Sequence, residues 1–154
     1  VQRVHDAGGV QPVAQWLYCP MLDDRTAANL HLDSVEHLVW DNRENRFGWQ
    51  AYLGIAPGSD ILPEYASPAR RKNLAGLPPA WIGCGDMDIF HAENLAYANR
   101  LQTAGVACTL DVVRGAPHGF ESVARETSLA RDYRRRARAW LGEQLGTKPR
   151  RVTP

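Results

Sequence analysis

An aspartate and a histidine that lie thirty positions apart are the most chemically suggestive residues of this sequence. Asp88 lies in the segment 85–90 and His118 in the segment 115–120, each just after a strand-like run. An acid followed by a base forms the second half of a Ser-Asp-His triad in which the serine comes first along the chain. No Gly-x-Ser-x-Gly motif occurs in the 154 residues. The pair therefore indicates serine-hydrolase chemistry for which this chain does not supply the nucleophile.

Both residues also have a plain structural interpretation. Asp88 precedes a helix-like stretch and would suit a helix N-cap, and His118 taken alone would be an ordinary loop histidine. The glycines that flank His118 favour the functional interpretation, because they permit a tight turn that projects the ring toward the ends of the strands. The chain holds other nucleophilic side chains, none of them in an elbow-like motif: Ser59, Ser67, Ser122 and Cys19.

The elements that must position this pair alternate between strands and helices. Strand-like runs cover 13–19, 79–84 and 108–113, and helical patterns cover 92–104 and 121–145. Strands that alternate with helices predict an α/β fold of about three parallel strands with flanking helices. In such a sheet the functional groups lie at the carboxyl ends of the strands, which is where Asp88 and His118 fall.

Residues 20–79 form a long excursion between the first two strands. We expect an acidic turn at 21–25, two short helices within 30–54, and a loop rich in Pro, Gly and Ser at 57–79. The excursion carries aromatic and amide side chains that are candidates for the wall of a substrate pocket: Trp40, Asn42, Phe47 and Trp49. The competing interpretation is that these side chains form the core of the excursion itself.

Composition predicts one soluble globular domain over residues 1–146, followed by a flexible tail at 147–154. Hydrophobic residues make up 44% and charged residues 23% of the chain, and the formal net charge is +1. That charge argues against nucleic acid as a partner. The arginine-rich run at 131–138 is accordingly interpreted as the solvated face of a helix. No apolar run reaches the roughly 18–20 residues that a membrane span requires.

The cysteine pattern predicts neither a metal site nor a disulfide framework. Cys19, Cys84 and Cys108 are widely spaced and form no Cys-x-x-Cys or Cys/His zinc motif. We expect buried free thiols in a reducing compartment, hence a cytoplasmic location. Asp23, Asp24 and His31 are interpreted as a polar turn, because they lack a metal-ligand spacing.

Several stretches together resemble the C-terminal half of the hormone-sensitive-lipase-like α/β-hydrolases, a group of bacterial carboxylesterases and arylesterases. They are the segments 18–25, 45–54, 76–80, 85–90 and 115–120. The resemblance extends from about Gln11 to Leu145. It implies an esterase for short acyl or aryl esters that needs no cofactor.

The same resemblance implies roles for individual residues. Asp88 is the triad acid and His118 the triad base, and Asp86 is less suited to be the acid. The family usually carries Asp-Glu shortly after the acid, whereas this chain has His91-Ala92-Glu93 and keeps only the glutamate. The family's oxyanion loop and nucleophile elbow would precede Val1, so they would come from an N-terminal hydrolase half.

A second hypothesis belongs to a different class. The chain is then a non-catalytic half-fold that acts as an interaction or oligomerisation module, because an open hydrophobic strand edge pairs readily with another chain. The candidate surfaces are strand 13–18, and strand 108–113 together with the last helix. Hydrolysis that returns when the missing half is added would favour the esterase, whereas a stable symmetric assembly without hydrolysis would favour the module.

Overall fold

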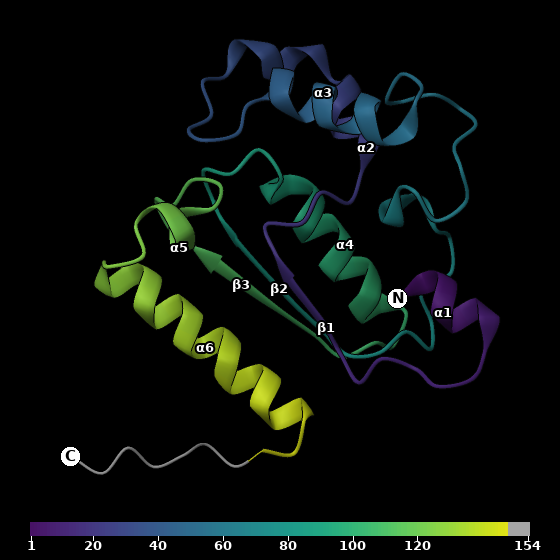
Figure 1. Cartoon of the computed structure of the whole chain (residues 1–154), viewed down its shortest axis with the longest axis vertical. Helices are drawn as coiled ribbons and strands as arrows, with labels where there is room; N and C mark the ends of the chain where they lie inside the picture. Colours follow the sequence, from purple (N-terminus) through teal and green to yellow (C-terminus); the bar gives the residue numbers. More distant parts are fainter. Residues whose placement is uncertain (148–154) are drawn as a thin grey trace.

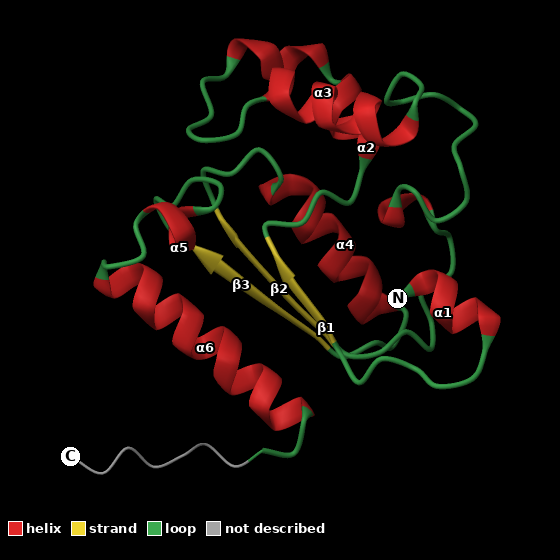
Figure 2. Ribbon diagram, viewed as in Figure 1, coloured by secondary structure: helices red, strands yellow, loops and turns green. Residues whose placement is uncertain are grey.

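A three-stranded parallel sheet forms the centre of the molecule (Figures 1 and 2). The computed structural model describes residues 1–147. The strands are β1 (Gln15–Tyr18), β2 (Ala80–Gly85) and β3 (Cys108–Val113), in the order β1-β2-β3. Ala80 pairs with Gln15 on one side and with Cys108 on the other. The predicted α/β architecture is confirmed, with strand bounds close to those expected.

Alternate residues of β2 face two separate cores, because successive side chains of a strand point to opposite faces. Ile82 packs in a core with Tyr97 and Leu101 of α4 (His91–Thr103). Trp81 packs in the other core with Tyr133 of α6 (Ser128–Gln144). The two helices thus cover opposite faces of the sheet, and every residue of β2 is buried.

The single C-terminal helix predicted over 121–145 is wrong, because the structure divides it in two. The short α5 (Phe120–Val123) is separated from α6 by residues 124–127. Thr127 is the N-cap of α6, and its hydroxyl accepts a hydrogen bond from the Ala130 amide at 3.2 Å. A threonine at this position starts a new helix by satisfying a free amide, which explains the break.

The excursion lies over the carboxyl end of the sheet (Figure 1). Its helical elements are α2 (Asp24–Ala28), the 3₁₀ turns η1 (Leu30–Ser34) and η2 (Pro68–Arg70), and α3 (Asn42–Leu53). Asp41 and Glu44 form a capping box that starts α3. The two short helices expected within 30–54 are therefore η1 and α3, whereas the expected acidic turn forms the start of α2.

Both ends of the described chain are outside the sheet. The short α1 (Gln2–Ala7) was not predicted, and the Gln2 amide attaches it to α4 through a hydrogen bond to the Tyr97 hydroxyl at 3.1 Å. The predicted flexible tail, Thr147 apart, lies outside the described residues. Within residues 1–147, no helix is both long enough and apolar enough to cross a membrane.

Candidate active site

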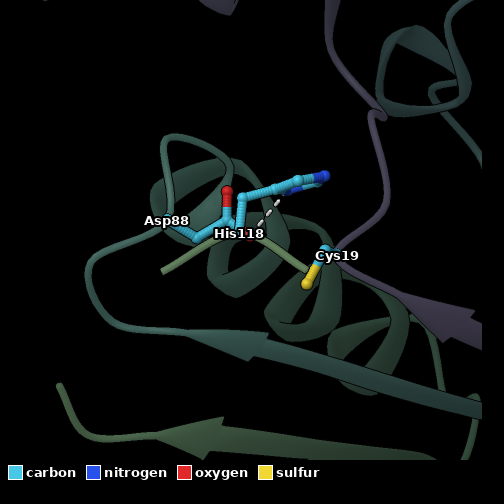
Figure 3. Close-up of side chains that lie close together, drawn as sticks. All are labelled: Cys19, Asp88 and His118. Carbon is cyan, nitrogen blue, oxygen red and sulfur yellow. Dashed lines mark hydrogen bonds and ion pairs between the residues drawn. The ribbon is translucent and has the colours of Figure 1, made fainter. Parts of the chain in front are cut away.

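Asp88 and His118 meet at the carboxyl edge of the sheet, as the sequence predicts (Figure 3). Asp88 follows β2 and His118 follows β3, and parallel pairing of these strands brings the two turns together. His118 Nδ1 lies 3.0 Å from Asp88 Oδ2. Because Nδ1 is engaged by the carboxylate, Nε2 is the ring nitrogen that can exchange a proton with a reacting group.

Asp88 also stabilises the turn that leads into α4. Its side chain is buried, with only 4% of the residue exposed, and Oδ1 accepts a hydrogen bond from the Phe90 amide at 2.9 Å. Phe90 is itself the N-cap residue of α4, and its buried ring meets the His118 ring edge-on at 5.4 Å. One carboxylate thus orients the imidazole and satisfies a free amide near the start of the helix.

The turn after β2 holds the histidine loop directly. Asp86 Oδ1 accepts a hydrogen bond from the Gly115 amide at 2.7 Å, and the Met87 amide donates to the Ala116 carbonyl at 3.2 Å. A Cβ on Gly85 would lie 1.8 Å from that same carbonyl oxygen. Sequence reasoning considered Asp86 only as a rival acid. No local motif pairs it with an amide 29 residues away, so this role was missed.

Cys19 lies beside the pair, a position that the sequence did not predict (Figure 3). It directly follows β1 with a left-handed φ of 42° and is 5% exposed. Burial raises the pKa of the Cys19 thiol, and the Asp88 charge raises it further. The cysteines are free thiols, and the expected burial is confirmed for Cys19 and Cys84 but is wrong for Cys108, which is half-buried.

The structure separates the four candidates for the pocket wall into two pairs. The Trp40 ring lies 6.1 Å from the His118 ring. Trp40 and Trp49 also line a hollow of about 410 Å³, with Met21 and Tyr52 among its other walls. Asn42 and Phe47 do not line this hollow.

Asn42 and Phe47 lie away from the hollow, one buried within the excursion and one exposed on its surface. The Asn42 amide is buried and donates hydrogen bonds to the Asn29 carbonyl at 3.1 Å and to Asp33 Oδ1 at 2.6 Å. Its polar group is therefore used to join α3 to η1. The Phe47 side chain is on the outer face of α3, where the residue is 75% exposed. The aromatic spacing of the sequence did not distinguish these outcomes.

The serines weighed as substitute nucleophiles are engaged away from His118. The Ser59 hydroxyl donates to the Ala56 carbonyl at 2.6 Å, and the buried Ser67 hydroxyl donates to the Leu22 carbonyl at 3.2 Å. Ser122 lies on the exposed side of α5. Their surroundings give them no link to the acid–base pair.

A buried ion pair holds the excursion together. Asp24 is fully buried and accepts hydrogen bonds from the Arg70 guanidinium at 2.6 and 2.7 Å and from the Gly58 amide at 2.6 Å. Burial alone would raise the pKa of Asp24, but these donors outweigh burial and lower it below the ordinary value. The expected polar turn around Asp24 is thus a buried structural centre, and the Arg70 cation from the loop 57–79 compensates its charge.

Glu93 connects the start of α4 to the segment after Cys19. Its Oε1 accepts hydrogen bonds from the Leu22 amide at 2.6 Å and from the Asp23 amide at 3.2 Å, and its Oε2 accepts one from the Thr26 hydroxyl. Burial raises the pKa of Glu93 to about 7, although these hydrogen bonds favour the charged form. The glutamate that the family pattern retains therefore fixes the excursion over the site.

Comparison with known proteins identifies the fold independently. A family profile described as alpha/beta hydrolase fold matches residues 1–122. The carboxylesterase NlhH of Mycobacterium tuberculosis is 31% identical over 150 residues, which cover 94% of this chain and 46% of NlhH. The chain thus spans about half the length of the curated relatives it matches.

Solved structures agree with this assignment. The esterase LipW from Mycobacterium marinum is 32% identical, with a TM-score of 0.75 over 86% of this chain and 40% of LipW. A bacterial heroin esterase is 28% identical, with a TM-score of 0.78 over 96% of this chain and 47% of that enzyme. The resemblance to hormone-sensitive-lipase-like carboxylesterases is confirmed, and the chain belongs to the α/β-hydrolase fold family.

Proposed function

We propose that this chain supplies the acid and the base of a carboxylic ester hydrolase that acts on short-chain acyl or aryl esters. The observation that carries the proposal is the 3.0 Å contact between His118 Nδ1 and Asp88 Oδ2 at the carboxyl edge of the sheet. The matched relatives named carboxylesterase or esterase support the reaction class. The three free cysteines support the predicted cytoplasmic location.

In this mechanism His118 moves the proton and Asp88 controls the histidine. His118 Nε2 accepts the proton of the attacking serine and then donates it to the leaving alkoxide. Asp88 keeps the ring proton on Nδ1 and stabilises the imidazolium that forms. The reaction requires no organic cofactor and no metal ion, because an activated serine and an oxyanion hole carry out acyl transfer.

The serine and the oxyanion donors come, in this proposal, from an N-terminal hydrolase half that extends the sheet beside β1. β1 is an edge strand whose described neighbour is β2, and Trp16 on this strand is 38% exposed. Loss of the nucleophile alone lowers kcat about 10⁶-fold in a serine hydrolase. Pairing of two copies through the same edge is the rival arrangement, and an equilibrium sedimentation measurement distinguishes a monomer from such a dimer.

Trp40 and the hollow behind it are the proposed binding wall for one arm of the ester. Trp40 lies between His118 and the apolar hollow, which also reaches Trp49 and Tyr52. An apolar cavity of a few hundred Å³ suits a short acyl chain or a phenyl ring. Asn42 is used to join α3 to η1 and Phe47 is exposed, so neither belongs to this wall.

The test joins the part of NlhH that this chain does not match to the front of this chain. The measurement is hydrolysis of p-nitrophenyl butyrate by the chain alone and by the chimera. We expect background rates from the chain alone and turnover from the chimera that His118→Ala abolishes. Turnover by the chain alone that depends on His118 would mean that a second nucleophile is present. A folded chimera without turnover would contradict the proposal.

Two neighbouring aspartates provide a matched control for the acid. Asp88→Asn in the chimera should lower kcat about 10⁴-fold, because the amide favours the wrong tautomer of His118. Asp86→Asn should lower kcat about tenfold or less, since it weakens only one hydrogen bond to the histidine loop. A larger loss at Asp86 would assign the acid to Asp86 instead, and equal losses would contradict the separate roles of the two aspartates.

A further inference from the structure

The Cys19 thiol lies beside the catalytic pair and has no part in the mechanism above (Figure 3). Its sulfur, one Asp88 carboxylate oxygen and one His118 ring nitrogen lie within 4.8 Å of one another. These three side-chain types are the ones that bind zinc and related borderline-soft cations. We propose that Cys19, Asp88 and His118 together bind a divalent cation of the zinc class, which holds His118 in a form that cannot act as the base.

The geometry fits a small ion that takes the place of one proton. His118 Nδ1 and Asp88 Oδ2 are 3.0 Å apart. Two ligand atoms at about 2.0–2.1 Å from a tetrahedral zinc ion are themselves about 3.3 Å apart, so the ion fits between them in place of the shared proton. Cys19 Sγ lies within 4.8 Å of the other two ligand atoms and must move closer to them to reach a zinc–sulfur distance of about 2.3 Å.

The three ligands come from the ends of three neighbouring strands, which fixes their relative positions. Cys19 follows β1, Asp88 follows β2 and His118 follows β3. The His118 side chain is 24% exposed, which leaves an approach for the ion and for water as the fourth ligand. No ligand spacing marks this site in the sequence, because each strand contributes a single residue.

The charges of the three ligands can balance those of a dication. A Cys19 thiolate and the Asp88 carboxylate together neutralise the two positive charges, and the imidazole binds as a neutral ligand. The thiol loses one proton to the solvent when the metal–sulfur bond forms. The proton on His118 Nδ1 moves to Nε2 as Nδ1 becomes a ligand. Nε2 then carries a proton and cannot accept one from serine.

The test is a titration of the 154-residue chain with Co²⁺ alone, followed by thiolate-to-cobalt charge-transfer absorbance. We expect one ion per chain and affinity that rises about tenfold per pH unit between pH 6 and pH 8, because one proton is released. Cys19→Ser should remove the absorbance and weaken binding more than about 100-fold, beyond the loss typical of an outer-shell change. Cys108→Ser, which changes a cysteine outside the cluster, should keep both.

A second variant decides the outcome if Cys19→Ser does not fold. His118 lies on a partly exposed loop, so His118→Ala should still fold. This variant should weaken cobalt binding to a similar extent as Cys19→Ser. No cobalt binding by the wild-type chain, or the same absorbance in Cys19→Ser, would overturn the proposal. Absorbance reports metal binding directly and does not depend on hydrolysis. If the chain binds cobalt but the chimera does not hydrolyse esters, the proposed function is contradicted and the metal site is not.

Discussion

The turns that carry Asp88 and His118 and the excursion that covers them are stabilised in different ways. The turns follow β2 and β3, which pair along their whole lengths, and backbone contacts such as Met87 to Ala116 hold them together. The excursion depends on buried charged side chains, chiefly Asp24 with Arg70 and Glu93 with the Leu22 amide. The sheet therefore positions Asp88 and His118, whereas buried charges hold the excursion in place.

Breaking the buried ion pair should give the largest effect on stability. Arg70→Met leaves the fully buried Asp24 carboxylate without its cation and should lower the free energy of unfolding by about 3–5 kcal/mol. Arg71→Met is the matched control, because Arg71 pairs with the exposed Asp6 and its loss should lower stability much less. Urea unfolding measures both variants. Equal losses would show that burial of the carboxylate is not what makes the pair important.

Glu93 should make the stability of the folded chain depend on pH. Its pKa is about 7 in the folded chain against an ordinary 4.5, so the folded state retains the proton over this interval. The contribution of Glu93 to stability is therefore fully present below about pH 4.5 and is lost as the pH rises through 7. Relative to Glu93→Gln, the wild type should lose on the order of 3 kcal/mol between pH 4.5 and pH 8.

Urea unfolding of the two proteins across this pH range measures the difference, since other titrating groups cancel. Glu36→Gln is the control, because Glu36 is exposed. A constant difference between wild type and Glu93→Gln would mean that hydrogen bonds to the carboxylate offset its burial completely.

A substitution of Gly85 at the carboxyl end of β2 should have a smaller effect on stability and should disturb the histidine loop. Gly85→Ala places a Cβ against the Ala116 carbonyl and should cost about 1–3 kcal/mol by overpacking. Gly48→Ala in α3 meets Trp40 and Met21 only at ordinary contact distances, so it should stabilise the chain by about 0.5–1 kcal/mol. Thermal unfolding compares the two variants. A neutral Gly85→Ala would show that the histidine loop moves freely relative to β2.

The sequence predicted the sheet well because its signals are local. Short apolar runs bounded by Pro and Gly predict buried strands, and β2 and β3 lie within a residue of their expected positions. The excursion was harder to predict. Its candidate pocket residues lie close together along the chain, so their spacing does not show which of them face the site: Trp40, Asn42, Phe47 and Trp49. Only packing decides that Trp40 faces His118 while Phe47 is exposed.

Reading the sequence alone was enough to predict the three strands, the helix α4 between β2 and β3, and Asp88 and His118 as the candidate acid and base. These depend on residue type and on position relative to a strand end, both of which can be read along the chain. The tertiary structure decided which distant groups meet: Asp86 with the Gly115 amide, Asp24 with Arg70, and Cys19 with Asp88 and His118. Such contacts join residues far apart along the chain, and their energies depend on burial and distance, which exist only after the chain has folded.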